Sequence, residues 1–312
     1  MSRKRKDRSI YVEAAIRTDL DTLWNYTQIP SKHVQWDLRF TAIEYLPRHT
    51  EEEIQRFHYQ TRIGFGLAIA GTGATRAGWL EKGGEPTRLS TLSFSSEQKL
   101  SLISKGRGYW QYTERGEDVI FLTRYDYKTR FGAAGKAFDR LLFRPLFGWA
   151  TAWSFDVLKI WLEQHIPPAA TIQRALIHYV SLMLLALLWL YQGIVPKLLY
   201  PETGELEQLH ASGLFSGWEQ QALVLLGLFE AALAVIFVVF HRSSMMYRLQ
   251  LLLLLLLPAI ALLNNPELLQ AAYNPATITI PMMGLCLVAR WTCKGLPNAS
   301  RCLRRPKMKA HE

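Results

Sequence analysis

The chain has 312 residues, 49% of them hydrophobic, and a formal net charge of +10, so it is long enough for two domains. Its basic residues gather near both ends with few aromatic residues between them, which argues against nucleic-acid binding and favours attraction to an anionic membrane surface. Hydropathy is also uneven, because a charged part that reaches about residue 170 precedes an oily part.

The chain opens with a predicted strand and two short helices. Between residues 10 and 16 apolar side chains alternate with others, which is the period of a half-buried strand. Thr18 and Asp21 have the spacing of a capping box, so a helix is expected to begin with Thr18 as its cap. Pro30 ends this helix, and residues 31–37 predict a second short one.

Six further strands and one long helix are expected next. The strand ranges are 39–46, 53–62, 67–80, 89–99, 107–114 and 119–128. Arg115-Gly116-Glu117-Asp118 predicts the turn between the last two strands. Bulges or strong curvature are expected at five glycines, Gly64, Gly66, Gly71, Gly73 and Gly78. The long helix covers about 134–164, and Pro145 is expected to kink it or divide it in two.

This order of elements, over residues 8–164, resembles the START-like or SRPBCC helix-grip superfamily. The resemblance rests on the opening strand, a helix that carries Trp24, the turn at Pro30, and Trp36-Asp37 before the next strand. It implies an α+β domain, residues 1–168, in which a curved antiparallel sheet grips the long helix around a cavity for an apolar ligand. Members of the superfamily range from lipid carriers to cyclases, so the fold does not settle the activity.

Aromatic residues of the predicted strands are the candidate lining of that cavity. We single out six as candidate ligand contacts, with ordinary core packing as the alternative for each: Phe57, Tyr59, Trp79, Phe94, Trp110 and Tyr125. This half contains no G-x-S-x-G, H-E-x-x-H or Walker motif, so catalytic residues stay unassigned. No metal site is predicted, and His33, His49 and His58 are expected to be surface or internally satisfied histidines.

The second half contains four long apolar stretches, 174–195, 218–240, 246–263 and 276–293. Each approaches the length of about 20 residues that a helix needs to cross the hydrocarbon core of a bilayer. They predict an all-α four-helix transmembrane bundle, residues 169–295, followed by a basic cytoplasmic tail, residues 296–312.

Loop charges predict how this bundle is inserted, since basic loops stay on the cytoplasmic side. The loop after the first stretch carries Glu202, Glu205 and Glu207 against Lys197, so it is expected outside. The next turn contains Arg242 and is expected inside. No apolar signal-peptide region follows the basic start, so we expect a multi-pass protein of the bacterial inner membrane with both termini in the cytoplasm.

Glu230 lies near the middle of the second apolar stretch. An acid at that depth costs about 2.5–3.5 kcal/mol on insertion scales, so it should face the bundle interior and be paired or protonated. His178, Ser181 and Gln192 lie on one stripe of the first stretch and are its expected polar neighbours. Glu230, His178 and Gln192 are therefore a candidate membrane site, with a purely packing role for the acid as the alternative.

Residues of about 172–293 resemble the DoxX-like family of bacterial four-helix membrane proteins. The resemblance rests on the end of the first stretch, from Trp189 to Pro201, on Glu230, and on the start of the fourth stretch, from Asn274 to Pro281. The family takes its name from a subunit of a thiosulfate:quinone oxidoreductase, which suggests quinone as a cofactor. No residue here matches a known redox centre.

Three functional hypotheses follow from the two resemblances. The first is a membrane-anchored binding protein whose partners are membrane lipids and a hydrophobic small molecule: a lipid, a quinone or a polyketide-like compound. The second is a non-catalytic or quinone-binding subunit that works with a membrane oxidoreductase partner. The third is a cyclase-like enzyme, for which the sequence offers no acid–base pair. We take the first as the working hypothesis.

Overall fold

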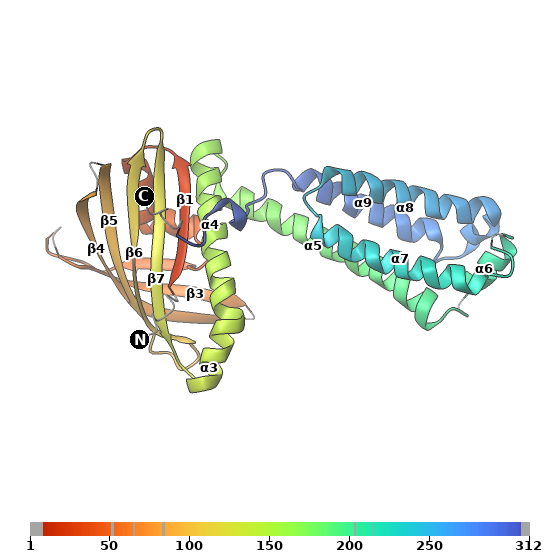
Figure 1. Ribbon diagram of the computed structural model, residues 1–312, viewed down its shortest axis with the longest axis horizontal. Helices are drawn as coiled ribbons and strands as arrows, with labels where there is room; N and C mark the ends of the chain where they lie inside the picture. Colours follow the sequence, from red (N-terminus) through yellow and green to blue (C-terminus); the bar gives the residue numbers. More distant parts are fainter. Residues whose placement is uncertain are drawn as a thin grey trace, which may run out of the picture. The chain divides into compact units, whose positions relative to one another are not determined.

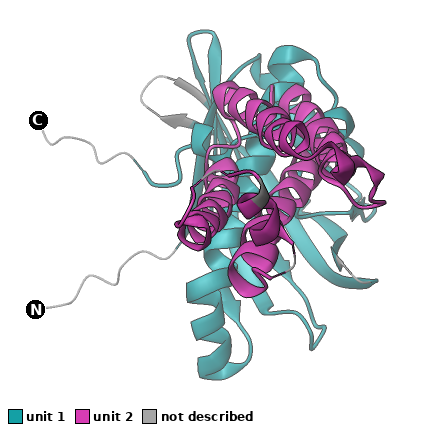
Figure 2. Ribbon diagram, turned by 90° about the vertical axis from the view of Figure 1, so that its right-hand side faces the viewer, with its two compact units in different colours: residues 1–171, 297–312 teal, residues 172–296 magenta. Residues whose placement is uncertain are grey.

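A computed structural model describes residues 9–50, 53–64, 66–82, 85–202, 204–213 and 215–306 of the chain. The chain divides into two compact units (Figure 2). Unit 1 contains residues 1–171 and 297–312, and unit 2 contains residues 172–296. The described part of the C-terminal segment, residues 297–306, groups with unit 1.

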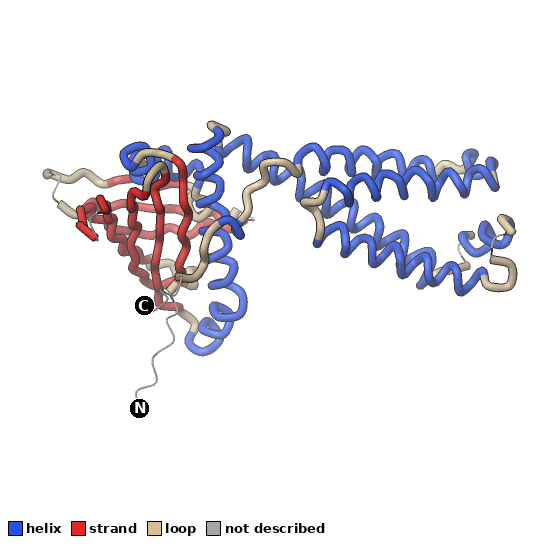
Figure 3. The backbone as a smooth tube through the Cα atoms, turned by 45° about the horizontal axis from the view of Figure 1, so that its top comes forward, coloured by secondary structure: helices blue, strands red, loops and turns tan. Residues whose placement is uncertain are grey.

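Unit 1 is built on one seven-stranded antiparallel sheet with the order β1-β7-β6-β5-β4-β3-β2 (Figures 1 and 3). The strands are β1 (Ile10–Arg17), β2 (Ala42–Tyr45), β3 (Gln55–Gly64), β4 (Leu67–Lys82), β5 (Glu85–Ser95), β6 (Ile103–Arg115) and β7 (Asp118–Thr129). Strands β2 to β7 follow one another as a meander, and β1 adds to its end beside β7. The predicted antiparallel sheet with a long closing helix is confirmed.

The helix α1 (Leu20–Gln28) begins one residue later than its predicted cap would require. Asp19 has extended backbone geometry, and its carboxylate accepts a hydrogen bond from the backbone N–H of Thr22 at 2.7 Å. An aspartate is a strong N-cap, so it satisfies the free N–H that Thr18 was expected to serve. The second helix was expected over residues 31–37, and α2 (Pro30–Trp36) begins one residue earlier, with the proline in its first turn.

The closing helix is divided at the predicted place. It consists of α3 (Gly132–Phe138), the π-helical turn η1 (Asp139–Phe143) and α4 (Arg144–Gln164). Pro145 has no N–H to bond the preceding turn, and its ring displaces that turn, so the chain widens into a π-turn just before the proline. The residues of α4 from Thr151 to Leu158 are all buried, which requires cover on more than one side of the helix.

Residues 297–303 supply the second cover of α4 within unit 1. Leu303 forms an isolated bridge to Glu13 on β1, with both backbone hydrogen bonds at 2.9 Å. The buried carboxylate of Asp156 accepts the backbone N–H of Asn298 at 2.7 Å and lies 3.2 Å from a guanidinium nitrogen of Arg301. The segment therefore covers the edge strand and stabilises an acid that the sheet leaves without a partner.

Asp156 gives a test of this cover. Burial raises the pKa of the Asp156 carboxyl above its ordinary value. The folded chain then holds this proton more tightly than the unfolded chain, so the contribution of Asp156 to stability is greatest at acidic pH and falls as the pH rises above about 4. In a fragment of residues 1–171, which lacks Asn298 and Arg301, Asp156→Asn should raise the unfolding free energy at neutral pH by about 1–3 kcal/mol.

In the full chain the gain at neutral pH should be smaller, because there the Asp156 carboxylate bonds to Asn298 and Arg301. Thermal unfolding followed by circular dichroism measures both effects, with Asp118→Asn as the control. If unit 1 unfolded at the same temperature in the 1–171 fragment and in the full chain, this result would contradict the stabilising role given to residues 297–306.

The longer secondary-structure elements of unit 2 are all helices. They are α5 (Pro168–Ile194), which continues into the π-helical η2 (Val195–Leu199), α6 (Glu205–Ala211), α7 (Glu219–Val239), α8 (Ser244–Asn264) and α9 (Pro275–Thr292). Two short 3-10 turns, η3 (Pro266–Gln270) and η4 (Ala299–Arg301), precede and follow α9.

Three of the described helices are long and apolar enough to cross a membrane: Pro168–Leu199, Glu219–Val239 and Ser244–Asn264. The fourth predicted span forms a helix, α9, but it has 18 residues and does not join the three, since prolines, threonines and Arg290 dilute its apolar content. Side chains on the outward faces of the three, such as Leu187, Val239 and Leu263, are exposed, the last by 83%. Lipid is the solvent that suits such surfaces.

Candidate functional site

A cavity of about 430 Å³ lies between the inner face of the sheet, α2 and the closing helix of unit 1. This is the size range of pockets that bind small molecules. Its apolar lining comes from the strands, the loops and the helices, and includes Leu38, Ile43, Leu92, Leu102, Ile103, Phe138, Phe143 and Phe147.

Five of the six aromatic residues predicted to contact a ligand lie on this lining: Phe57, Tyr59, Phe94, Trp110 and Tyr125. Trp79 does not. Strand alternation places it on the same face of β4, but it lies toward the β4–β5 hairpin, where its side chain is 64% exposed. The guanidinium of Arg88 lies over the Trp79 ring at 4.7 Å and over the Trp24 ring at 4.1 Å, so this tryptophan belongs to a stack outside the cavity.

Glycines of neighbouring strands hold two of the lining rings against the sheet. Phe57 is the register partner of Gly73, and Phe94 is the partner of Gly106. A Cβ atom on either glycine would lie 2.2 Å from the facing ring, so only glycine leaves room for the ring to lie across the strand. Gly73, expected to mark a bulge or curvature, therefore shapes the cavity floor, and β3 and β4 shift register only between Arg62 and Gly64.

The polar side of the cavity is an ion pair backed by a histidine. Arg39 donates from Nε to Asp37 Oδ1 at 2.8 Å and from Nη2 to Oδ2 at 2.6 Å, and His33 Nε2 lies 3.0 Å from the same Oδ2. Burial by itself would raise the pKa of Asp37, but Arg39 and His33 outweigh it and hold that pKa well below its ordinary value. Because the aspartate cancels the charge of the guanidinium, the cavity wall is close to neutral.

Most other polar groups on the lining also have partners within the protein. The hydroxyl of Tyr125 hydrogen-bonds Thr151 at 2.7 Å, and that of Tyr45 donates to the Gln28 carbonyl at 2.8 Å. Thr27 hydrogen-bonds Tyr112 at 2.8 Å. A cavity whose polar groups are satisfied in this way favours an apolar ligand. His33 is buried and bonded to Asp37, so it is an internally satisfied histidine and not a surface one. The i,i+4 spacing of His33 and Asp37 is the sequence signal for this bond.

In unit 2, Glu230 pairs with a buried lysine. Glu230 and Lys197 are each 5% exposed, and their charged atoms lie 3.0 Å apart in an ion pair without hydrogen-bond geometry. Lys197 Nζ also lies 2.9 Å from Glu205 Oε2 and donates to the Gln192 carbonyl at 3.1 Å. The acid was expected to be paired, but its partner is a residue that we had assigned to the outer loop.

Two glycines allow this pairing, because they let α5 and α7 cross closely. A Cβ atom on Gly193 would lie 2.5 Å from the carbonyl oxygen of Gly227, and one on Gly227 would lie 2.6 Å from that of Gly193. The π-helical η2 follows at once and carries Lys197 to the crossing. Close helix approach at small residues is typical of membrane helix pairs.

His178 lies elsewhere, in a second polar cluster. Its Nδ1 is 2.9 Å from the Ala289 carbonyl, which can only accept, so Nδ1 carries the hydrogen. Its Nε2 therefore accepts from Nδ1 of His241 at 2.9 Å. His178 and Gln192 are 14 residues apart, about 21 Å along the helix, so they cannot share one site with Glu230. Gln192 offers only its carbonyl there.

The Lys197 cluster gives a stability prediction. Lys197→Met should cost about 3–5 kcal/mol, because it leaves Glu230 buried without a cation, whereas Glu230→Gln should cost less, since Lys197 keeps Glu205. The double variant Lys197→Met/Glu230→Leu should recover most of the loss. Unfolding in detergent measures the cycle, with Glu267→Gln as control. Glu230→Leu closes the cycle. A double variant that loses as much as the sum of Lys197→Met and Glu230→Leu would show that the pair is not coupled.

Residues 186–287 match the DoxX-like family. The chain is 49% identical over 189 residues to the "Uncharacterized membrane protein YndG" of Bacillus subtilis (strain 168), and the match covers 60% of this chain and 69% of that protein.

Two solved structures are weakly similar. TTHA0849 from Thermus thermophilus has 11% identity and a TM-score of 0.33, covering 44% of this chain and 86% of that one. The di-domain ARO/CYC StfQ from the steffimycin biosynthetic pathway has 15% identity and a TM-score of 0.36, covering 50% of this chain and 51% of that one. Because both similarities are low, the fold of unit 1 is assigned from its own strand order and closing helix.

Proposed function

This chain belongs to the DoxX-like family through its C-terminal unit, and from that premise we propose that it is a membrane-anchored protein that binds a hydrophobic ligand in the cavity of unit 1. The cavity of about 430 Å³, with its aromatic lining and internally satisfied polar groups, is the observation that carries the proposal. Lipids, quinones and polyketide-like compounds are the ligand classes that suit it.

The charge of the cavity wall indicates whether the ligand is neutral or anionic. Arg39 is the cation on the lining, and its Nε and Nη2 already donate to Asp37. An anionic ligand would have to compete with that carboxylate at hydrogen-bond distance, which a neutral carbonyl or hydroxyl does not. We therefore expect a ligand that is largely apolar and carries a neutral polar group.

Filling the cavity tests the proposal. Ala150 lies on the lining, so Ala150→Trp should place an indole in the ligand space and reduce the ligand that copurifies with the full chain by at least about fivefold. Ala134→Trp makes the same change at an exposed position of α3 outside the lining and should leave the ligand content unchanged. Native mass spectrometry and solvent extraction measure both variants.

Equal ligand content in the two variants would contradict binding in this cavity. A quinone retained by both would favour the alternative, a quinone-binding subunit of a membrane oxidoreductase system whose site lies in unit 2.

We also propose that the chain crosses the membrane four times, with α9 as the fourth crossing and both termini in the cytoplasm. The contacts Asp156–Asn298 and Glu13–Leu303 support this, because they return the chain after α9 to the unit in which it began. A chain that starts and finishes on one side needs an even number of crossings, and three helices are candidates without α9. Arg242, between α7 and α8, favours the cytoplasm for that side.

Reporter fusions test this topology. Fusions after Glu207 and after Gln270 should report the outside of the inner membrane, while fusions after Arg242 and at Glu312 should report the cytoplasm. Outside signals at both Gln270 and Glu312 would mean that α9 does not cross.

A further inference from the structure

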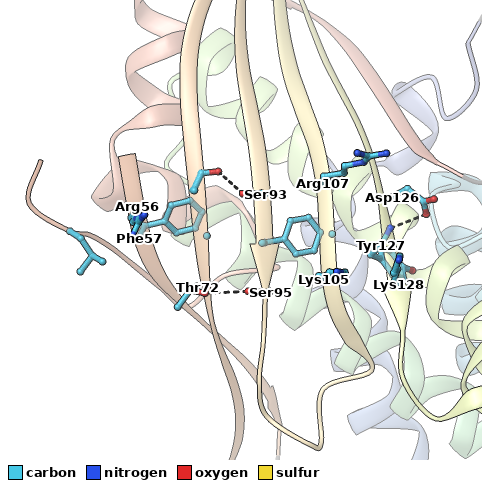
Figure 4. A pocket seen from close by; sticks show the side chains of 15 residues that line it. Arg56, Phe57, Thr72, Ser93, Ser95, Lys105, Arg107, Asp126, Tyr127 and Lys128 are labelled. Carbon is cyan, nitrogen blue, oxygen red and sulfur yellow. Dashed lines mark hydrogen bonds between the residues drawn. The ribbon is translucent and has the colours of Figure 1, made fainter. Parts of the chain in front are cut away.

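The outer face of the sheet, opposite the cavity, holds a trough of about 870 Å³ (Figure 4). Its floor consists of short side chains on the central strands β4 and β5: Thr72, Ala74, Ser93 and Ser95. Its sides carry long basic side chains, Arg56 on β3, Lys105 and Arg107 on β6, and Lys128 on β7.

The strand register builds this trough in two rows. One row runs Arg56–Ala74–Ser93–Arg107 across β3 to β6, and the next runs Thr72–Ser95–Lys105–Lys128 across β4 to β7. Strands lie about 4.8 Å apart, so the backbones at Arg56 and Arg107 are about 14 Å apart. Two cationic rims thus face each other across a floor of hydroxyl groups.

The described residues provide little negative charge to balance these rims. Lys105 and Lys128 are register partners, and like charges directly opposite each other destabilise a sheet. Asp126 is the one acid on the trough lining and the register partner of Arg107, and its carboxylate pairs with Arg144 at 2.9 Å. Within the described parts of the chain, no acid pairs with Arg56, Lys105, Arg107 or Lys128, and all four are exposed.

The cationic character continues beyond the trough. A second hollow of about 560 Å³ on the same face shares Ser93 and Arg107 with the first and adds Arg76 and Arg124. Ser9 lines its end, and the sequence just before Ser9 contains five basic residues in positions 3–8. The charge is therefore spread over several strands, which suits a surface of many phosphates better than a single small anion.

We propose that this outer face docks on the phosphate headgroups of an anionic phospholipid membrane. The guanidinium groups of Arg56 and Arg107 match phosphate oxygens, and the short side chains between them leave room for a headgroup. The protein is already held in a membrane by unit 2, so the lipid surface is its most abundant anion. This docking is independent of what the cavity on the opposite face binds.

Amine labelling of the full chain in nanodiscs tests the docking. Lys105 and Lys128 should react at least about fivefold more slowly in discs with about a third of anionic phosphatidylglycerol than in phosphatidylcholine discs. The difference should vanish in about 0.5 M salt, where charges are screened within a few ångströms. Lys136, exposed on α3, should react equally in both discs. Equal reactivity of Lys105 and Lys128 in the two discs would overturn the proposal.

A pair of charge-reversal variants separates this face from net charge. Arg56→Glu/Arg107→Glu should abolish the protection of Lys128, with thermal unfolding confirming that these exposed positions leave the fold intact. Lys99→Glu/Arg140→Glu makes the same charge change at exposed positions off the trough and should keep the protection. Loss of protection in both variants would overturn the assignment to this face. Protection by millimolar glycerol phosphate in phosphatidylcholine discs would overturn it in favour of a soluble phosphate ligand.

Discussion

The return of residues 297–303 to unit 1 is the contact on which the membrane arrangement depends. Leu303 extends the sheet edge at Glu13, and the buried Asp156 carboxylate accepts hydrogen bonds from the Asn298 backbone and the Arg301 guanidinium. A buried carboxylate that lost these partners would destabilise α4, the helix that the sheet grips. Under the proposed topology, the fold of unit 1 and the number of membrane crossings are linked, since the segment can reach Asp156 only if the chain comes back to the side from which it left.

The sheet of unit 1 has two faces of opposite character, and the same strands produce both. On the inner face Gly73 and Gly106 accept the rings of Phe57 and Phe94, so aromatic side chains lie flat and leave a neutral, apolar space. Period-2 alternation turns the residues between them outward, where they form the cationic trough. The basic side chains of the trough do not line the cavity, and Phe57 and Phe94 border both.

Local patterns in the sequence predicted what local physics controls. Alternation located the strands, and the missing N–H of Pro145 located the π-helical division of the closing helix. Contacts between distant residues were beyond such patterns. Trp79 lies on the face of β4 that borders the cavity, but it is too far along the strand to reach it. Lys197 was expected in a loop, and the π-helical η2 places it beside Glu230. The distance of about 21 Å between His178 and Gln192 shows that a shared helical stripe does not make a shared site.

Anchoring a cavity protein to a bilayer changes its binding more than new contacts would. A hydrophobic ligand is concentrated in lipid and scarce in water, so a soluble carrier depends on rare encounters. A tether converts the encounter with the membrane into an intramolecular one, with an effective concentration set by the length of the connection. Here α4 and α5 are separated by only a few residues, from His165 to Pro167, so the connection between the sheet-and-helix domain and the first candidate span is short. Moderate affinity in the cavity is then enough for occupancy, which fits a lining that offers apolar surface and few free hydrogen-bonding groups.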